Sequence, residues 1–225
     1  MALNEAEMGI LDPSGASDWT ALHGAAIAER SVWFQFTLSN TDYMGAGKLL
    51  VDMLERDNDS RLNIYFLGSG TPDIIGVSPG DSVQNASMLN ITGHYGMQWE
   101  PEFVSWYENS FIQAECHYKL GNEDLALAKL NETLDGIEQR WQGLGFSSAS
   151  IPRYSDLSGD ELFAAIMNEK YKALFLNMQS WSDWRRTGYP HFIDSENNST
   201  ECGGTSEGNG VPRRLLYPEK EKASN

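Results

Sequence analysis

The sequence is poor in cysteine and contains no long apolar run. Its two cysteines, Cys116 and Cys202, are too few for a framework of several disulfides, and no pattern indicates a bond between them. No stretch reaches the roughly 18 apolar residues that a membrane-spanning helix requires. Residues 1–7 also lack the basic and apolar regions of a secretory signal. We therefore expect residues 1–225 to be soluble.

Basic residues are scarce as well. The 32 acidic residues outnumber the 16 basic ones, which gives a formal net charge of -16 at pH 7. A charge of this sign repels both a phosphate backbone and an anionic bilayer surface, so nucleic acid is excluded as a partner. Hydrophobic residues make up 40% of the chain and aromatic residues 11%, which is the composition of a globular protein with a substantial core.

The usual sequence patterns of catalytic and metal sites are missing. The chain has no Cys-x-x-Cys pair, no Gly-x-Ser-x-Gly and no phosphate-binding loop. Its four histidines are scattered through the sequence: His23, His94, His117 and His191. The run 57–59 superficially resembles a calcium loop, but Arg61 stands where another oxygen ligand is needed. We predict no catalytic residue, no metal and no cofactor.

Apolar spacing predicts three long helices, at residues 101–120, 123–142 and 160–186. In each, apolar side chains recur at steps of three and four residues, which is the period of a helix with one buried face. Pro101 suits a first helical position, because it has no amide hydrogen to leave unpaired. Gly121 suits the end of that helix, and Ser158 with Glu161 forms a capping-box pattern before the third.

The first two of these helices form a predicted αα-hairpin joined by residues 120–122. Its sequence is similar to one tetratricopeptide unit, and one unit cannot bury its own faces. The predicted fold class is therefore mostly α, with a tetratricopeptide-like hairpin packed against further long helices. Three segments are expected to be irregular: a lead at 1–18, a loop-rich segment with short strands at 62–100, and a flexible loop at 194–210.

Four segments occur in the order of a known family's motifs. They are residues 59–62 (DSRL), 106–115 (WYENSFIQAE), 173–190 (ALFLNMQSWSDWRRTGYP) and 211–225 (VPRRLLYPEKEKASN). Together they resemble the signature of the SusD/RagB-like family of outer-membrane, nutrient-binding lipoproteins, with Ser60 where the family has proline. Because members of that family are about twice as long, the resemblance implies that residues 1–225 are a single, incomplete domain from the C-terminal portion.

The resemblance also implies a function. Family members are non-enzymatic, bind glycans or other nutrients at the cell surface, and work with a TonB-dependent outer-membrane transporter. A signal and a lipid-anchor cysteine would then lie beyond residues 1–225. The residues of the helix motifs are expected to form a structural knot rather than a ligand site: Glu108, Glu115, Trp181, Asp183, Arg185 and Arg186. We expect Trp181 and Leu174 to be buried, and Arg185 or Arg186 to form an ion pair or to stack on an aromatic ring.

The segment 62–100 offers the best candidates for a glycan site. Sugar rings present apolar faces that stack on aromatic rings, while their hydroxyl groups bond to amide and carboxyl side chains. This segment combines both kinds of residue, and the candidates are Tyr65, Tyr95, Trp99, Asn90 and Gln98. The alternative for each ring is that it fills a small core beneath the loop.

Two other functions are compatible with the sequence. A tetratricopeptide-type adaptor would bind a peptide partner in a helical groove, but it would need several stacked repeats. A carbohydrate-active enzyme would need two carboxylates facing each other across a sugar, and 32 acidic residues make such a pair uninformative in sequence alone.

Overall fold

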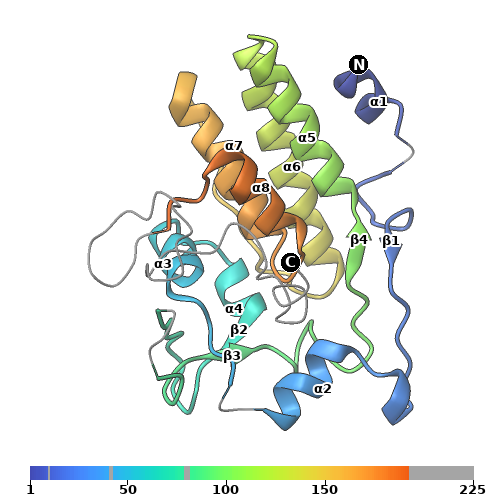
Figure 1. Cartoon of the computed structure of the whole chain (residues 1–225), viewed down its shortest axis with the longest axis vertical. Coiled ribbons are helices and arrows are strands. Elements are labelled where there is room, and N and C mark those ends of the chain that lie inside the picture. The colour runs from blue at the N-terminus through green and yellow to red at the C-terminus, as the bar shows by residue number, and fades with distance from the viewer. Residues whose placement is uncertain (10, 41–42, 79–81, 193–225) are drawn as a thin grey trace, which may run out of the picture. The chain divides into compact units, whose positions relative to one another are not determined.

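The computed structural model describes residues 1–9, 11–40, 43–78 and 82–192, and Met1–Pro190 form one compact unit (Figure 1). Helices dominate this unit, as the sequence predicts. They are α1 (Ala2–Glu7), α2 (Val32–Ser39), α3 (Lys48–Arg56), α4 (Arg61–Tyr65), α5 (Trp106–Lys119), α6 (Glu123–Gly143), α7 (Gly159–Ala173) and α8 (Gln179–Thr187), with a 3-10 turn at Ile27–Glu29. The predicted irregular lead at 1–18 thus contains the short helix α1.

The strands are short and form two antiparallel pairs. Strand β1 (Trp19–Thr20) pairs with β4 (Glu102–Val104), and β2 (Phe66–Leu67) pairs with β3 (Met88–Leu89). The segment 62–100 otherwise follows an irregular path after α4, as expected from its glycines and prolines. The loop at 194–210, the terminal motif at 211–225 and Cys202 lie outside the described residues.

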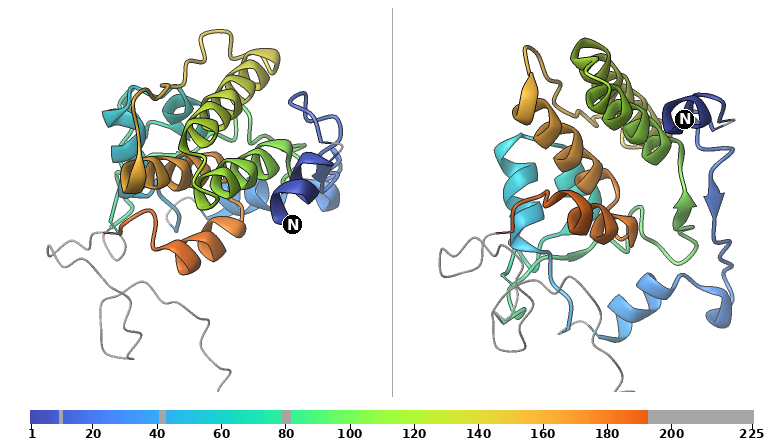
Figure 2. Two further views of the ribbon diagram at one scale, coloured as in Figure 1. Left: turned by 90° about the horizontal axis from the view of Figure 1, so that it is seen from above. Right: turned by 45° about the horizontal axis from the view of Figure 1, so that its top comes forward.

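Helices α5 and α6 form the predicted hairpin. The Ser105 hydroxyl accepts a hydrogen bond from the Glu108 amide at the start of α5, and Gly121 follows its end with a left-handed φ of 78°. Gly136 allows the two helices to approach closely, because a methyl group at that position would collide with the Trp106 ring. Helix α7 packs against both members of the hairpin (Figure 2). The buried residues between them include Phe111, Ala114, Leu130, Leu134, Leu162 and Ile166.

The boundaries of two predicted helices are wrong. The first begins at Trp106 instead of Pro101, because Glu102–Val104 extend to pair with β1. The predicted helix 160–186 is divided into α7 and α8, and Leu176 between them has a φ of 65°. Asn177 stabilises this break: its side-chain oxygen accepts from the Gln179 amide, and its Nδ2 donates to the Glu102 carbonyl.

A second core lies beneath the loop-rich segment. Helices α3 and α4 contribute Leu50, Val51, Leu54, Ile64 and Tyr65, strand β3 contributes Leu89, and the chain after it contributes Tyr95 and Trp99. Phe175, which follows α7, stacks on Tyr65 with ring centroids 4.8 Å apart. The end of α7 therefore packs against this core, while its middle packs against the hairpin.

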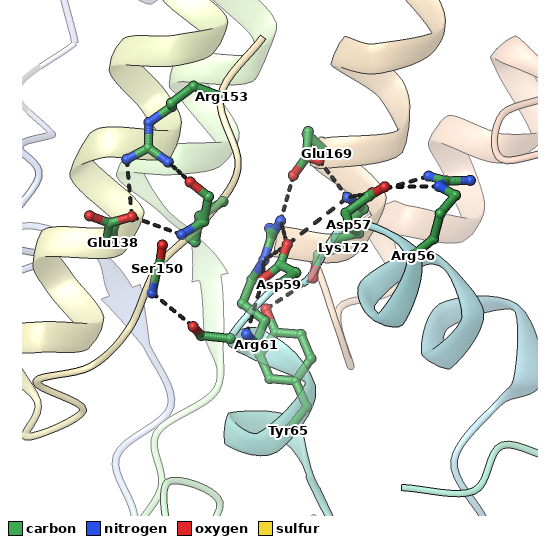
Figure 3. A network of polar contacts seen from close by, with 12 residues as sticks. Arg56, Asp57, Asp59, Arg61, Tyr65, Glu138, Ser150, Arg153, Glu169 and Lys172 are labelled. Atoms are coloured by element: carbon green, nitrogen blue, oxygen red, sulfur yellow. Dashed lines mark hydrogen bonds and ion pairs between the residues drawn. The ribbon is translucent and has the colours of Figure 1, made fainter.

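Ion pairs buried between α4 and α7 connect the two cores (Figure 3). The fully buried Arg61 guanidinium lies 2.5 Å from both Asp59 Oδ2 and Glu169 Oε2, and Lys172 Nζ lies 2.5 Å from Glu169 Oε1. Burial raises the pKa of Glu169, but the charges of Arg61 and Lys172 outweigh this effect and hold it below its usual value. The motif at 59–62 thus supplies the central cation of a buried network.

We expect Leu174→Ala to lower the free energy of unfolding by about 2 to 5 kcal/mol, because the side chain is only 1% exposed and a cavity would remain. Urea denaturation measures this change. The matched control is Met178→Ala, since Met178 is 83% exposed and should change stability by less than about 0.5 kcal/mol. Equal losses at the two positions would contradict the burial of Leu174.

A second prediction concerns His94, whose ring contacts Trp141 and Tyr95. Burial, with a smaller effect of the Arg140 charge, lowers the pKa of His94 from 6.5 to about 4. Between these two values the unfolded chain takes up a proton that the folded chain does not, so stability should fall as the pH falls from 6.5 to 4, by as much as about 3 kcal/mol.

His94→Phe keeps an aromatic ring but removes this titration. The free energy of unfolding of the variant, measured by denaturant titration at several pH values, should therefore decline less between pH 6.5 and 4 than that of the wild type. Parallel curves for the two proteins would show that His94 is not the group responsible.

Candidate functional site

The aromatic residues predicted for a glycan site are buried. Tyr65, Tyr95 and Trp99 are 1%, 3% and 9% exposed, so the expectation of an open stacking surface at these rings is wrong. Tyr65 donates its hydroxyl hydrogen to the Lys172 carbonyl, and its ring is covered by Phe175. Tyr65 is therefore buried by the end of α7 and by Phe175 after it, more than a hundred residues later in the sequence.

The two polar candidates of the same set differ from each other. Asn90 is buried, where its Nδ2 donates to the carbonyl groups of Asn63 and Ile64 and its Oδ1 accepts from the Gly93 amide. These bonds organise the turn that follows β3. Gln98 is exposed. The cavity among the buried rings has a volume of about 30 Å³, which is room for one water molecule and not for a sugar.

Five of the six predicted helix-motif residues make an ion pair or a stacking contact: Glu115, Asp183, Arg186, Arg185 and Trp181. Arg186 pairs with Glu115 on α5 and with Asp183, and Lys170 Nζ lies 2.7 Å from Asp183 Oδ2 without hydrogen-bond geometry. The Arg185 guanidinium lies 4.6 Å from the centre of the Trp181 ring. The expected ion pair and stacking contact are therefore both confirmed.

The prediction that Trp181 is buried is wrong. Trp181 is half-buried, and the neighbouring Trp184 is the buried tryptophan of α8. Glu108 is half-buried, and burial raises its pKa while the nearby Lys170 charge acts in the opposite direction. The pair of Arg186 with Glu115 joins α8 to helix α5 of the hairpin.

Exposed aromatic rings occur instead on the β1–β4 ribbon. Trp19 on β1 is 66% exposed and Phe103 on β4 is 54% exposed, and their ring centroids lie 5.5 Å apart at an interplanar angle of 55°. Successive side chains of a strand point to opposite faces. Asp18 and Glu102, each one residue before a ring, accordingly point inward to Arg140.

The inward face of the ribbon is held by charged hydrogen bonds. Arg140 donates to Asp18 Oδ2 at 2.6 Å and to Glu102 Oε1 at 2.9 Å, and Tyr107 donates its hydroxyl hydrogen to Glu102 at 3.2 Å. The Trp106 amide donates to the other oxygen of Asp18 at 2.7 Å. Burial raises the pKa of Glu102, and the Arg140 charge opposes that shift. Both strands are therefore fixed to α5 and α6, which holds the two outward rings in place.

An open hollow of about 630 Å³ begins two residues after β1. Leu22 and Val32 supply apolar lining, while His23, Glu29, Arg30 and Gln35 supply polar groups. Backbone contacts shape this segment, since His23 Nδ1 lies 3.0 Å from the Glu29 carbonyl and Gln35 donates to the Arg30 carbonyl. The Trp19 ring and these hydrogen-bonding side chains thus follow each other along one stretch of chain.

Sequence reasoning did not identify Trp19 or Phe103. The available signal was the alternation of an acidic residue with an aromatic one in Asp18-Trp19 and Glu102-Phe103, but a strand of two or three residues is too short to recognise by its period. Within residues 1–9, 11–40, 43–78 and 82–192, no cluster of three His, Cys, Asp or Glu side chains could hold a metal ion. In the same ranges, no helix combines the length and the apolar character needed to cross a membrane.

Solved structures with the same fold include two SusD homologues. One is from Bacteroides fragilis NCTC 9343, with 18% identity and a TM-score of 0.73, covering 98% of this chain and 55% of the other. The second is from Bacteroides vulgatus ATCC 8482, with 20% identity and a TM-score of 0.71, covering 99% and 53%. A chitin-binding protein also matches, with 21% identity and a TM-score of 0.68, covering 92% and 49%. A search of curated proteins gave no significant match.

The chain therefore spans about half the length of the solved structures that it matches. At the level of sequence families, residues 2–218 match the SusD-like model described as "Starch-binding associating with outer membrane". This match covers nearly the whole chain and agrees with the helical fold and the buried motif residues. The protein belongs to the SusD-like family.

Proposed function

We propose that the protein is a non-enzymatic glycan-binding component of a nutrient-uptake system at the outer membrane. The observation that carries this proposal is the match of residues 2–218 to a family described as starch-binding and associated with that membrane. A chitin-binding protein of the same fold adds support for a carbohydrate ligand. The acidic character of the chain is compatible with an uncharged ligand such as a neutral glycan.

Two finer parts of the proposal rest on the family alone. We propose that the protein acts at the cell surface as part of a lipoprotein, and that it delivers its ligand to a TonB-dependent transporter. Pull-down of the protein from outer membranes solubilised in mild detergent tests the partnership. Recovery of a TonB-dependent transporter supports it, and recovery of the protein without any transporter contradicts it.

We place the glycan-binding surface on the β1–β4 ribbon. Trp19 and Phe103 are exposed rings, and both are carried by strands that charged bonds fix to the helical core. A rigid ring loses little conformational entropy when a sugar stacks on it, so such a surface is ready for binding. The polar side chains that line the following hollow can bond to sugar hydroxyl groups.

The peptide-adaptor alternative has less support. The part of the chain that the structure describes contains one tetratricopeptide-like hairpin, α5–α6, and not a stack of repeats that would form a superhelical groove.

Binding is best tested first with a glycan array that includes starch and chitin oligosaccharides, followed by isothermal titration calorimetry on each ligand found. For a bound glycan, we expect Trp19→Ala to weaken affinity about tenfold or more, which corresponds to roughly 1.4 kcal/mol. The thermal unfolding midpoint should change little, because Trp19 is mostly exposed.

The matched control is Tyr43→Ala, which removes an aromatic ring that is 78% exposed and lies outside the ribbon and the hollow. Its affinity should equal that of the wild type. If both variants bind the glycan as tightly as the wild type, the ribbon is not the binding surface. If no glycan binds to the wild type at all, the proposed function itself is wrong.

A further inference from the structure

A second hollow, separate from the ribbon, lies between α1, α5 and α6 and has a volume of about 420 Å³. Small-molecule sites in proteins usually have volumes of about 300 to 1,000 Å³, so this one suits a ligand at the small end of that range. The ion pairs of α8 and the exposed rings of the ribbon do not line this hollow. Trp106 does line it, and its amide also bonds to Asp18 beneath the ribbon.

One wall is a polar stripe on α5. Asn109, Gln113 and His117 occur at intervals of four residues and so share a face of the helix. Asn109 Nδ2 and Gln113 Nε2 both donate to the Ala6 carbonyl, at 2.9 and 3.0 Å. These bonds fix the two amides with their donors toward α1. Their side-chain oxygens accept no hydrogen bond from the described residues, so each remains available to a donor from a ligand.

His117 completes this wall of the hollow. Its Nε2 lies 3.9 Å from Glu7 Oε1, which is beyond hydrogen-bond distance, so this nitrogen is available to a hydroxyl group of a ligand. Its Nδ1 is buried, so a ligand in the hollow does not reach that atom.

The opposite wall combines charge with apolar surface. On α6, Lys129 pairs with Glu132 at 2.9 Å, and Ala128 and Leu125 provide apolar contact. The buried Trp106 also lines the hollow. Amide oxygens and carboxylates need donors from the ligand, whereas the lysine ammonium group needs an acceptor.

These groups together define the ligand class. A purely apolar ligand would leave the polar groups unpaired, and an anion would be repelled by the carboxylates of Glu7 and Glu132. Hydroxyl groups both donate and accept, and several on adjacent carbons match a lining that offers acceptors together with the Lys129 ammonium donor. We propose that this hollow is a second binding site, for a neutral, polyhydroxylated ligand the size of one sugar residue. This site rests on the proposed function in that sugars are taken as the ligand.

The test is calorimetric titration of the 225-residue chain with D-glucose and with N-acetyl-D-glucosamine, supported by ligand-observed NMR for weak binding. We expect His117→Leu to weaken binding of the recognised monosaccharide about tenfold or more. The unfolding midpoint should not fall, because the imidazole Nδ1 makes no bond to the described residues. Gln113→Leu should weaken binding as well, and its unfolding curve monitors the loss of the bond to Ala6.

Gln84→Leu is the matched control, since Gln84 is exposed and lies outside the hollow. Its affinity for the monosaccharide should equal that of the wild type, and so should that of Trp19→Ala if the two sites are separate. Unchanged affinity in His117→Leu, or no monosaccharide binding by a wild-type protein that binds a longer glycan through Trp19, overturns this inference and leaves the proposed function in place. A wild-type protein that binds no sugar of any length overturns both.

Discussion

Burial of the Arg61 guanidinium between Asp59 and Glu169 is the interaction on which the arrangement of the two cores depends. The charges of Arg61 and Lys172 balance those of Asp59 and Glu169, so the desolvation cost of burying them is offset by mutual attraction at 2.5 Å or a little more. Removing one member would leave an uncompensated buried charge, which usually costs about 3 to 5 kcal/mol. Because Arg61 begins α4 and Glu169 lies in α7, this pairing sets where the aromatic core meets the hairpin core (Figure 3).

A second arginine paired with two carboxylates lies beneath the ribbon. Arg140 on α6 pairs with Asp18 and Glu102, and these are the residues whose neighbours, Trp19 and Phe103, point outward. In both places a cation from one element fixes carboxylates from segments distant in sequence. The Arg61 network is fully buried and joins the two cores. The Arg140 network instead fixes two very short strands that carry exposed aromatic rings. Both the packing of the cores and the position of the exposed rings thus depend on one kind of contact.

The hairpin was predictable because its information is local: apolar steps of three and four, Gly121 at the turn and acidic residues at the start of α6 all agree. The remaining errors come from contacts between distant segments. Glu102–Val104 leave the predicted helix because β1 pairs with them, and the break at Leu176 depends on Asn177 bonding to Glu102. Tyr65 and Tyr95 pack on Phe175, and Trp99 packs on Tyr95, and no pattern within residues 62–100 could reveal the contact with Phe175. The sequence also could not show that Trp19 is exposed, or that one pocket is lined by Asn109, Gln113 and His117. Both features depend on how α1, β1 and α5 pack.

The proposed ribbon surface and the proposed pocket meet at the first residue of α5. The Trp106 amide donates to Asp18, which anchors the strand that carries Trp19, while the Trp106 ring lines the pocket. That ring is fixed in turn by its close packing on Gly136 of α6, where no larger residue would fit. The backbone of Trp106 therefore contributes to the anchor of the ribbon, and its side chain contributes to the packing of α5 on α6 and to the wall of the pocket.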